Sequence, residues 1–278
     1  MFSISVVDED GKPYAGLKPE NFQVWVDKTP RKIISLTTET TPATVGILFD
    51  LSGSFGPPRK KESTAFRRKL SDALTRFLAV NNAENDYFVG TFGTRVAFSP
   101  TWTGPAESIL ENMDAPENYG QTAMYDALHH GIQNLMKSRH SRRVLLIISD
   151  GVDNQSKRTY KEVAELVKRS DVTIYAMAVY EQGTRGTALG AEGLEVLDDL
   201  AKLSGGRAVF LNSAATDEVV NNAFEIVADN LKSQYQLSIE NEPVARSGKW
   251  HKLKLKLNLP DEKGQPKLDI WSRPGYYQ

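Results

Sequence analysis

Short apolar segments alternate with amphipathic segments from about residue 44 to about residue 232, and this alternation constrains the fold more than any other feature. The apolar runs predict strands at 44–50, 87–92, 96–99, 143–149, 173–179 and 208–211. The amphipathic segments predict helices at about 60–79, 122–137, 161–170, 194–203 and 217–232. Strands that alternate with helices form a parallel sheet covered by helices. We therefore expect an α/β fold with a doubly wound, mostly parallel central sheet.

The two ends of the chain have a different pattern. In the N-terminal segment, short runs rich in Val, Ile, Phe and Trp are separated by turn signals at Asp10-Gly11 and at 28–30. In the C-terminal stretch WHKLKLKLNLP, leucines alternate with lysines, as in a strand with one apolar and one solvated face. Neither end alone has enough strands for a stable sheet.

Both ends together are expected to form one small antiparallel β-sandwich, because chain termini commonly lie close together. The predicted division is residues 1–40 and 233–278 for this discontinuous β domain and residues 41–232 for the α/β domain. The alternative is that each end separately extends an edge of the central sheet.

The composition excludes several classes of partner and cofactor. Of the 278 residues, 40% are hydrophobic and 25% are charged, and the formal net charge of -1 gives no reason to expect nucleic acid or an anionic membrane as partner. The chain has no cysteine, which removes disulfides, zinc–thiolate sites and iron–sulfur clusters. No window approaches the run of roughly 18 apolar residues that a membrane span needs, so direct membrane insertion is not expected. The first residues also lack the pattern of a signal peptide.

Oxygen-bearing side chains gather where predicted strands end. Asp50, Ser52 and Ser54 follow the first central strand at two-residue spacing, so in an extended segment they project to the same side. Thr122 lies at the start of a predicted helix, and Asp150 follows another buried strand. Because open α/β sheets bind ligands at the carboxyl ends of their strands, we expect these five side chains to converge there.

Carboxylate and hydroxyl oxygens select hard cations, with Mg²⁺ the first choice and Mn²⁺ or Ca²⁺ close behind. Two carboxylates only just neutralise such an ion, so one exchangeable position can accept a carboxylate from a partner protein. Each motif alone has a simpler explanation, because Asp, Ser and Gly are common in turns and Thr122 alone would be interpreted as a helix cap. The conjunction of three motifs favours the metal site.

The stretches D-L-S-G-S at 50–54, G-Q-T-A at 120–123 and S-D-G at 149–151 resemble the von Willebrand factor type A (VWA) domain and its metal-ion-dependent adhesion site (MIDAS). The resemblance covers about residues 41–232 and implies a Rossmann-like fold. It also implies that the metal is held by Asp50, Ser52, Ser54, Thr122 and Asp150. Gln121 stands where many members have glycine, and Phe55 where methionine is frequent. Neither departure removes a ligand.

The flanking segments resemble a family of bacterial exported VWA-related proteins, through VVDEDGKPYAGLKPENFQVWVDKTPRKIISL ahead of the domain and YQLSIEN, GKWHKLKLKL and RPGYY behind it. This resemblance implies an exported protein, located in the periplasm, at the cell surface or in the medium. A cytoplasmic location stays open.

The signatures of common α/β enzymes are missing. The second acid of a phosphatase D-x-D pair is replaced by Ser52, no glycine-rich nucleotide-binding motif occurs, and the surroundings of Ser54 do not fit G-x-S-x-G. We therefore predict a non-catalytic adhesion module, no enzyme, whose Mg²⁺ captures an Asp or Glu side chain of a protein partner. The alternatives are a metal-assisted hydrolase, which lacks a convincing general base, and a structural exported module whose metal only stabilises loops.

The recognition surface is expected in the loops at 55–59, 118–121 and 152–156. Asp126 is expected to favour the N-terminus of its helix, and Asp153 and Asn154 to shape the turn after Asp150.

Overall fold

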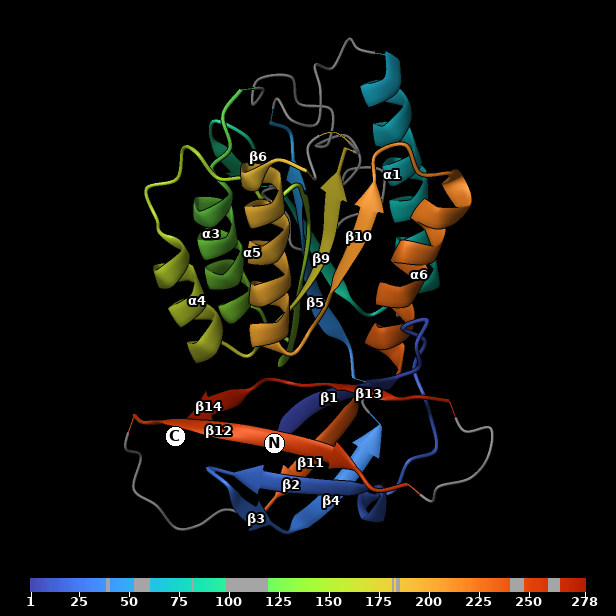
Figure 1. The fold of residues 1–278 in the computed structure, drawn as a ribbon, viewed down its shortest axis with the longest axis vertical. Helices are drawn as coiled ribbons and strands as arrows, with labels where there is room; N and C mark the ends of the chain where they lie inside the picture. Colours follow the sequence, from blue (N-terminus) through green and yellow to red (C-terminus); the bar gives the residue numbers. More distant parts are fainter. Residues whose placement is uncertain are drawn as a thin grey trace.

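The computed structural model has an α/β part with a smaller all-β part below it (Figure 1). The structure describes residues 1–38, 41–52, 61–81, 83–98, 120–181, 183, 186–240, 248–259 and 266–278, without the side chains of 61–64.

The α/β part is built on a six-stranded sheet with the strand order β10-β9-β8-β5-β6-β7. Neighbouring strands are parallel except for the antiparallel pair of β6 and β7. The strands are β5 (Ala43–Asp50), β6 (Asp86–Phe92), β7 (Val96–Phe98), β8 (Arg142–Ser149), β9 (Val172–Tyr180) and β10 (Ala208–Asn212). The mostly parallel sheet predicted from the sequence is therefore confirmed.

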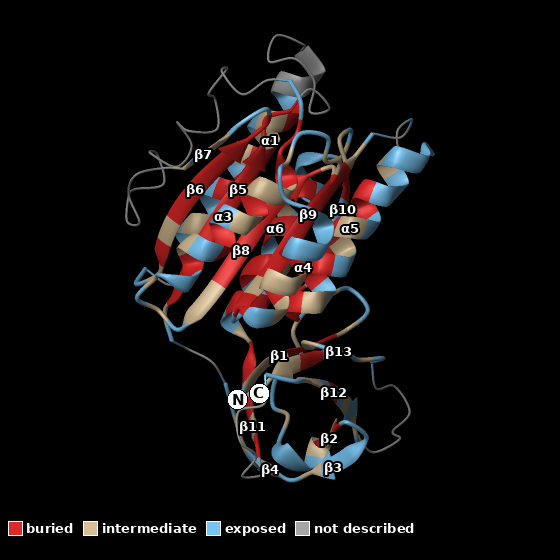
Figure 2. Ribbon diagram, turned by 90° about the vertical axis from the view of Figure 1, so that its left-hand side faces the viewer, coloured by how far each residue is buried: buried red, intermediate tan, exposed pale blue. Residues whose placement is uncertain are grey.

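Helices cover both faces of this sheet (Figures 1 and 2). One face carries α1 (Lys61–Val80) and α6 (Asp217–Lys232), and the other carries α3 (Met124–Met136), α4 (Tyr160–Arg169) and α5 (Ala188–Ser204). In β5, Ile47 and Phe49 belong to the core on the α1 and α6 side, whereas Leu48 belongs to the core on the α3 side. Burial on both faces explains why the central strands are apolar without alternation.

Helix α5 begins at Ala188, six residues before the predicted start. Its N-cap is Thr187, whose side chain accepts a hydrogen bond from Gly190 N–H. Glycines 190 and 193 interrupt the apolar periodicity of this first part, so the pattern predicted only the second half of the helix.

Strands from both chain ends form two separate four-stranded antiparallel sheets, β13-β1-β11-β4 and β14-β12-β2-β3. The N-terminal elements are β1 (Phe2–Val7), the short 3-10 helix η1 (Pro19–Asn21), β2 (Phe22–Val26), β3 (Thr29–Arg31) and β4 (Ile33–Thr38). The C-terminal strands are β11 (Tyr235–Ile239), β12 (Trp250–Leu257), β13 (Asp269–Trp271) and β14 (Gly275–Tyr277). Each sheet mixes both ends, which confirms the predicted sandwich over the alternative of separate edge additions.

The sandwich has its own apolar core, in which Ile4 and Val24 from the N-terminal end pack with Leu237 and Leu253 from the C-terminal end. The lysines of β12 are exposed, as its alternating pattern predicts. The predicted turn at 28–30 lies one residue earlier, where Asp27 and Lys28 adopt φ angles of 48° and 72° and join β2 to β3. The division of the chain at residues 40 and 232 into two folding units stays a prediction.

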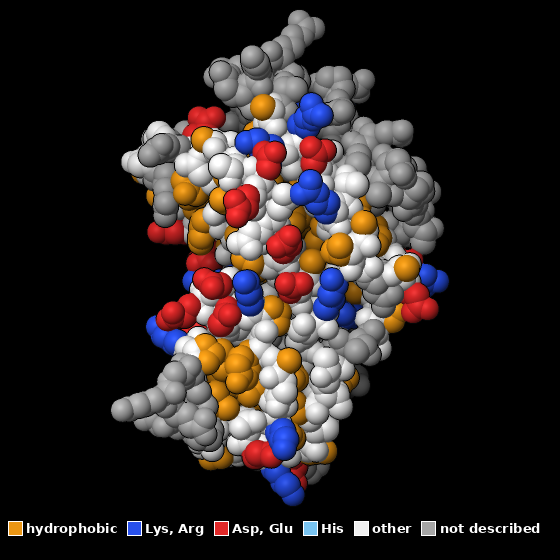
Figure 3. Space-filling view, turned by 90° about the vertical axis from the view of Figure 1, so that its right-hand side faces the viewer, with side chains coloured by type: hydrophobic (Ala, Val, Ile, Leu, Met, Phe, Trp, Pro, Cys, Tyr) orange, Lys and Arg blue, Asp and Glu red, His pale blue; other side chains and the backbone are white. Residues whose placement is uncertain are grey.

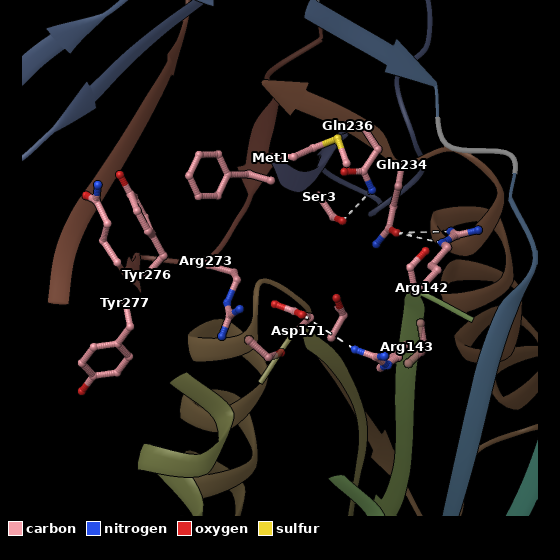
Figure 4. Close-up of a pocket in the computed structure, with 16 residues that line it drawn as sticks. Met1, Ser3, Arg142, Arg143, Asp171, Gln234, Gln236, Arg273, Tyr276 and Tyr277 are labelled. Atoms are coloured by element: carbon pink, nitrogen blue, oxygen red, sulfur yellow. Dashed lines mark hydrogen bonds and ion pairs between the residues drawn. The ribbon is translucent and has the colours of Figure 1, made fainter. Parts of the chain in front are cut away.

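The sandwich contacts the amino-terminal end of the central sheet, away from Asp50. Arg273 Nη2 donates to the carbonyl oxygens of Val167 and Lys168, 2.6 and 3.1 Å away, at the end of α4. A cavity of about 510 Å³ lies at this joint, and the ion pair of Arg143 and Asp171, 3.7 Å apart, lines it (Figure 4). The joint therefore leaves the carboxyl edge of the sheet uncovered by the sandwich.

On the face that carries α1 and α6, acidic and basic side chains are interspersed and hydrophobic side chains gather lower down, over the sandwich (Figure 3). Among helices in the described part of the chain, none combines the length and apolarity needed to cross a membrane.

Candidate functional site

Asp50 ends β5 at the carboxyl edge of the central sheet and is fully buried, with 0% of its surface exposed. It shares a strand face with Leu48, two residues earlier, which packs in the same core as Met124 of α3. Its Oδ1 accepts a hydrogen bond of 2.8 Å from Ser52 N–H, and its Oδ2 accepts one of 2.6 Å from the hydroxyl of Ser149. The strand end thus holds this carboxylate rigidly on the side of the sheet where α3 begins.

Asp150 follows β8, the strand next to β5. Because Phe49 is paired with Ile148 in the parallel register, Asp50 is level with Ser149 and Asp150 comes directly after it. Asp150 is half-buried, and its Oδ1 accepts a hydrogen bond of 3.0 Å from Val152 N–H. The two carboxylates therefore lie at the ends of adjacent strands.

Gly151 sets the path of the loop that carries Asp150. Its φ of 82° is in the left-handed region, and a Cβ added there would lie 1.9 Å from the carbonyl oxygen of Gly193 in α5. A Cβ on Gly193 would in turn lie 2.7 Å from the carbonyl oxygen of Asp150. The loop backbone therefore packs directly on the helix backbone, and only glycine fits this contact.

Thr122 is buried two residues before α3 and does not cap that helix. The N-cap is Ala123, and this cap has no side-chain hydrogen bond. The N–H of Thr122 donates to Asn154 Oδ1 at 2.7 Å, and its carbonyl oxygen accepts from Asn154 N–H at 3.0 Å. The helix-cap explanation of Thr122 is therefore wrong, and its backbone is fixed by the loop that follows Asp150.

The same loop supplies the cap of α3. One carboxylate oxygen of Asp153 accepts from Tyr125 N–H at 2.9 Å and from the Ser156 hydroxyl at 2.6 Å. The oxygen of that hydroxyl accepts from Asp126 N–H at 3.0 Å. In return, the Asp126 carboxylate accepts from the backbone N–H groups of residues 157 and 158 at 3.1 and 3.0 Å. Two loops are thereby locked together by reciprocal hydrogen bonds.

Sequence reasoning missed this reciprocal link. It assigned Asp153 and Asn154 to the turn and Asp126 to the start of its own helix. Asp153 does accept from Ser156 N–H in its own turn, and Asp126 lies in the first turn of α3, but all three also bind backbone N–H groups of the other segment. The partners are about 30 residues apart, so no local spacing reveals the pairing. The available signal was the concentration of capping residue types after Asp150, immediately ahead of a helix that has its own capping residue, Thr159.

The two strand-end carboxylates strongly oppose each other's charge. Burial, and next to it the nearby Asp150 carboxylate, together raise the pKa of Asp50 to about 7, against the opposing effect of hydrogen bonds from Ser149 and Ser52. Among the residues that the structure describes, no three His, Asp or Glu side chains are placed so that they could hold a metal ion together. The oxygen-bearing side chains at this edge are two carboxylates, Asp50 and Asp150, with the hydroxyl-bearing residues Ser52 and Thr122 beside them, and oxygen donors of this kind fit a small hard cation.

Four of the five predicted site residues lie at this edge, and the fifth, Ser54, lies outside the described residues. Asp50 and Ser52 are buried at the end of β5, Asp50 and Asp150 interact electrostatically, and Asp150 and Thr122 line one cavity. The predicted recognition loop at 55–59 and residues 118 and 119 also lie outside the described residues. Gln121 is exposed, and its N–H donates to Thr94 Oγ1 at 3.2 Å.

A doubly wound sheet with oxygen-bearing side chains from three loops at its carboxyl edge defines a class of proteins that bind ligands at strand-end loops. The family is given by sequence comparison. The model of the von Willebrand factor type A domain matches residues 45–224, and the chain belongs to this family.

Solved structures of the same fold include the mussel byssus proximal thread matrix protein 1 with a zinc-occupied MIDAS motif, at a TM-score of 0.55 and 17% identity over 74% of this chain and 50% of that chain. A von Willebrand factor type A protein from Catenulispora acidiphila matches at 0.51 and 15% identity, over 82% of this chain and 49% of that one. The hypothetical protein BatB from Bacteroides thetaiotaomicron matches at 0.50 and 15% identity, over 69% of this chain and 100% of that one.

These identities are low, so the likenesses show the fold alone. The chain spans about half the length of the mussel and Catenulispora proteins. No curated protein matches the sequence.

Proposed function

We propose that this chain is a non-catalytic, divalent-metal-dependent protein-binding module of the adhesion type. Asp50, Ser52, Ser54, Thr122 and Asp150 would hold Mg²⁺ at the carboxyl edge of the sheet. The observation that carries the proposal is the fully buried carboxylate of Asp50 beside the carboxylate of Asp150. Two like charges so placed are unfavourable unless a cation compensates them.

The charge balance supports an acidic side chain as the ligand of this site. A bound Mg²⁺ would neutralise the two carboxylates and offer a position for one more anionic oxygen. The other proposed protein ligands are neutral hydroxyls. An Asp or Glu of a partner protein would therefore be the third anionic ligand of the ion, and it would meet no anionic protein ligand besides Asp50 and Asp150. Mn²⁺ and Ca²⁺ present similar hard-cation chemistry and are the natural substitutes.

A hydrolytic role is less well supported because the neighbouring acids are already engaged. Asp126 accepts hydrogen bonds from two backbone N–H groups, and Asp153 accepts from Tyr125 N–H and the Ser156 hydroxyl. A general base needs a lone pair directed at a water molecule. These two carboxylates are used instead to hold the loops in place.

The metal site is tested by thermal unfolding with increasing Mg²⁺, Mn²⁺ or Ca²⁺ after treatment with chelator. We expect the wild type to gain stability on metal addition, by about 2.7 kcal/mol at a concentration 100 times the dissociation constant. Asp50→Asn, Asp150→Asn and Thr122→Val should lose most of this gain. Glu192→Gln is the matched control, because it also removes one negative charge near the site without removing a proposed ligand. Glu192 is an exposed acid in α5, and its charge raises the pKa of Tyr125 at the start of α3.

An equal gain in Asp50→Asn and in wild type would contradict the proposed site. Partner binding is tested by capture of proteins from an extract of the source organism, in Mg²⁺ and in EDTA, with the wild type and Asp50→Asn. Capture that survives both EDTA and the substitution would favour a metal that only stabilises the loops. Chelator-sensitive hydrolysis of a phosphate or ester would restore the hydrolase alternative.

We also propose that the protein acts outside the cytoplasm and that residues 1–40 and 233–278 form a β domain that presents the VWA domain. The resemblance of both flanks to exported VWA-related proteins supports the location. The mixing of both chain ends in each sheet supports the domain division. Cell fractionation tests the first statement, and separate expression of residues 41–232 tests the second.

A further inference from the structure

A cavity of about 280 Å³, here called the side pocket, opens directly beside the candidate metal site. Thr122 and Asp150 line it, so the pocket and the metal site share two residues. The apolar part of the wall comes from Val152, Val179, Leu189 and Leu194. A ligand atom bound at the metal site therefore has this pocket as its immediate neighbour.

The apolar residues of the wall differ in exposure, from buried at the base of the pocket to exposed at its rim. Val179 in β9 and Leu194 in α5 are 5% and 6% exposed and belong to the packed interior. Leu189, in the first turn of α5, is 59% exposed, and Val152 is half-buried. Leu189 and Val152 thus offer apolar surface that a ligand can remove from water, on a wall already rigid at its base.

Charge and size limit what the pocket accepts. Among its described lining residues, Asp150 alone is charged, and a cation at the metal site would neutralise it. The volume lies just below the range of about 300–1,000 Å³ typical for sites that bind drug-sized molecules. These properties fit a single large apolar side chain better than a separate small-molecule ligand.

We infer that the partner's acidic residue is accompanied by a large apolar side chain, such as Leu, Ile or Phe, which enters the side pocket while the carboxylate binds at the metal. This inference rests on the proposed function. Each methylene group that leaves water strengthens binding about fourfold. The side pocket therefore selects those acidic residues of a partner that have a large apolar side chain beside them.

The probes are acetate, 3-methylbutanoate, 4-methylpentanoate and 3-phenylpropanoate, titrated in 10 mM Mg²⁺ and followed by the amide shifts of the ¹⁵N-labelled full chain. We expect binding to strengthen at least about tenfold from acetate to 4-methylpentanoate. Leu189→Ser and Val152→Thr should weaken the longer acids toward the affinity of acetate. Val219→Ser is the matched control, because Val219 is 50% exposed on α6, across the sheet.

The thermal gain from Mg²⁺ alone is measured in every variant, and it separates the two proposals. If Mg²⁺ stabilises the chain but all four acids bind equally, the side pocket inference fails and the metal site stands. If the preference for longer acids persists in EDTA, or is equally lost in Val219→Ser, the inference fails as well. If Mg²⁺ has no effect on wild type, the metal site and the pocket assignment fail together.

Discussion

Replacing Asp50 with Asn should stabilise the metal-free protein at neutral and alkaline pH. Asn keeps the size of the side chain, and its amide oxygen still accepts from Ser52 N–H while its amide nitrogen donates to the Ser149 hydroxyl. The substitution therefore removes the charge and keeps the local packing and the two hydrogen-bond partners, with the direction of the bond to Ser149 reversed. Its effect on stability isolates the free energy of holding a charged carboxylate at this position.

The sign and size of the effect follow from the pKa of Asp50, which rises from 3.8 to about 7 on folding. Below about pH 4 the carboxyl is protonated in both states and contributes nothing. Between pH 4 and 7 the folded state keeps the proton that the unfolded state loses, so stability falls as the pH rises. Above pH 7 the full difference applies, which corresponds to about 4 kcal/mol.

The assay is urea unfolding of wild type and Asp50→Asn in EDTA, from pH 4.5 to 8.5. The two proteins should be similar at the acidic end, and the variant should be more stable by several kcal/mol at about pH 8. Saturating Mg²⁺ should then stabilise only the wild type, and increasingly so as the pH rises. Equal pH dependence of the two proteins in EDTA would refute the reasoning, since it would mean that Asp50 is not a buried, charge-opposed group.

Further predictions address the loops. Thr122→Val should leave the stability in EDTA within about 1 kcal/mol of wild type, because Thr122 does not cap α3, yet reduce the gain from Mg²⁺; a large loss in EDTA would restore the cap explanation. Gly151→Ala should destabilise by about 2 kcal/mol or more in urea unfolding, whereas Gly183→Ala, where an added Cβ meets no described residue within 4 Å, should be nearly neutral. Asp153→Ala should cost about 1–2 kcal/mol by removing the cap of α3 and should also weaken Mg²⁺ binding; an unchanged metal titration would show that the loops position the site independently.

Most of the fold could be predicted because its signals are local. The apolar run before Asp50 specifies a strand buried on both faces, and the alternating leucines and lysines of β12 specify a strand and its exposed face, each within ten residues. The start of α5 was missed because the helix opens with an exposed leucine and glycines, and its cap at Thr187 contributes no apolar periodicity. Local sequence therefore predicts an element well where its own pattern, and not a distant contact, determines its ends.

In the candidate site too, residues fixed by the local pattern could be predicted, and residues fixed by distant contacts could not. Asp50, Thr122 and Asp150 could be placed together because the carboxyl ends of parallel strands share an edge. The cap of α3 by Asp153 could not, because it joins segments about 30 residues apart through a loop that has no periodic pattern. The contact of Gly151 with Gly193 is likewise a close approach of two backbones. A glycine in the sequence does not reveal which other segment its backbone will contact.

The candidate site combines residues that stabilise its loops with a pair of carboxylates that destabilise the folded state. The capping residues Asp153, Asn154 and Asp126 satisfy backbone N–H groups and hold the loops in place. Asp50 and Asp150, in contrast, oppose each other, and burial of Asp50 together with this repulsion destabilises the folded state by about 4 kcal/mol above pH 7. Folding alone gains nothing from such a pair, and an amide at position 50 would keep the same two partners, with the hydrogen bond to the Ser149 hydroxyl reversed in direction. A cation bound between the two carboxylates would offset this unfavourable free energy. The free energy of metal binding and that of the charged pair should therefore be measured in the same protein.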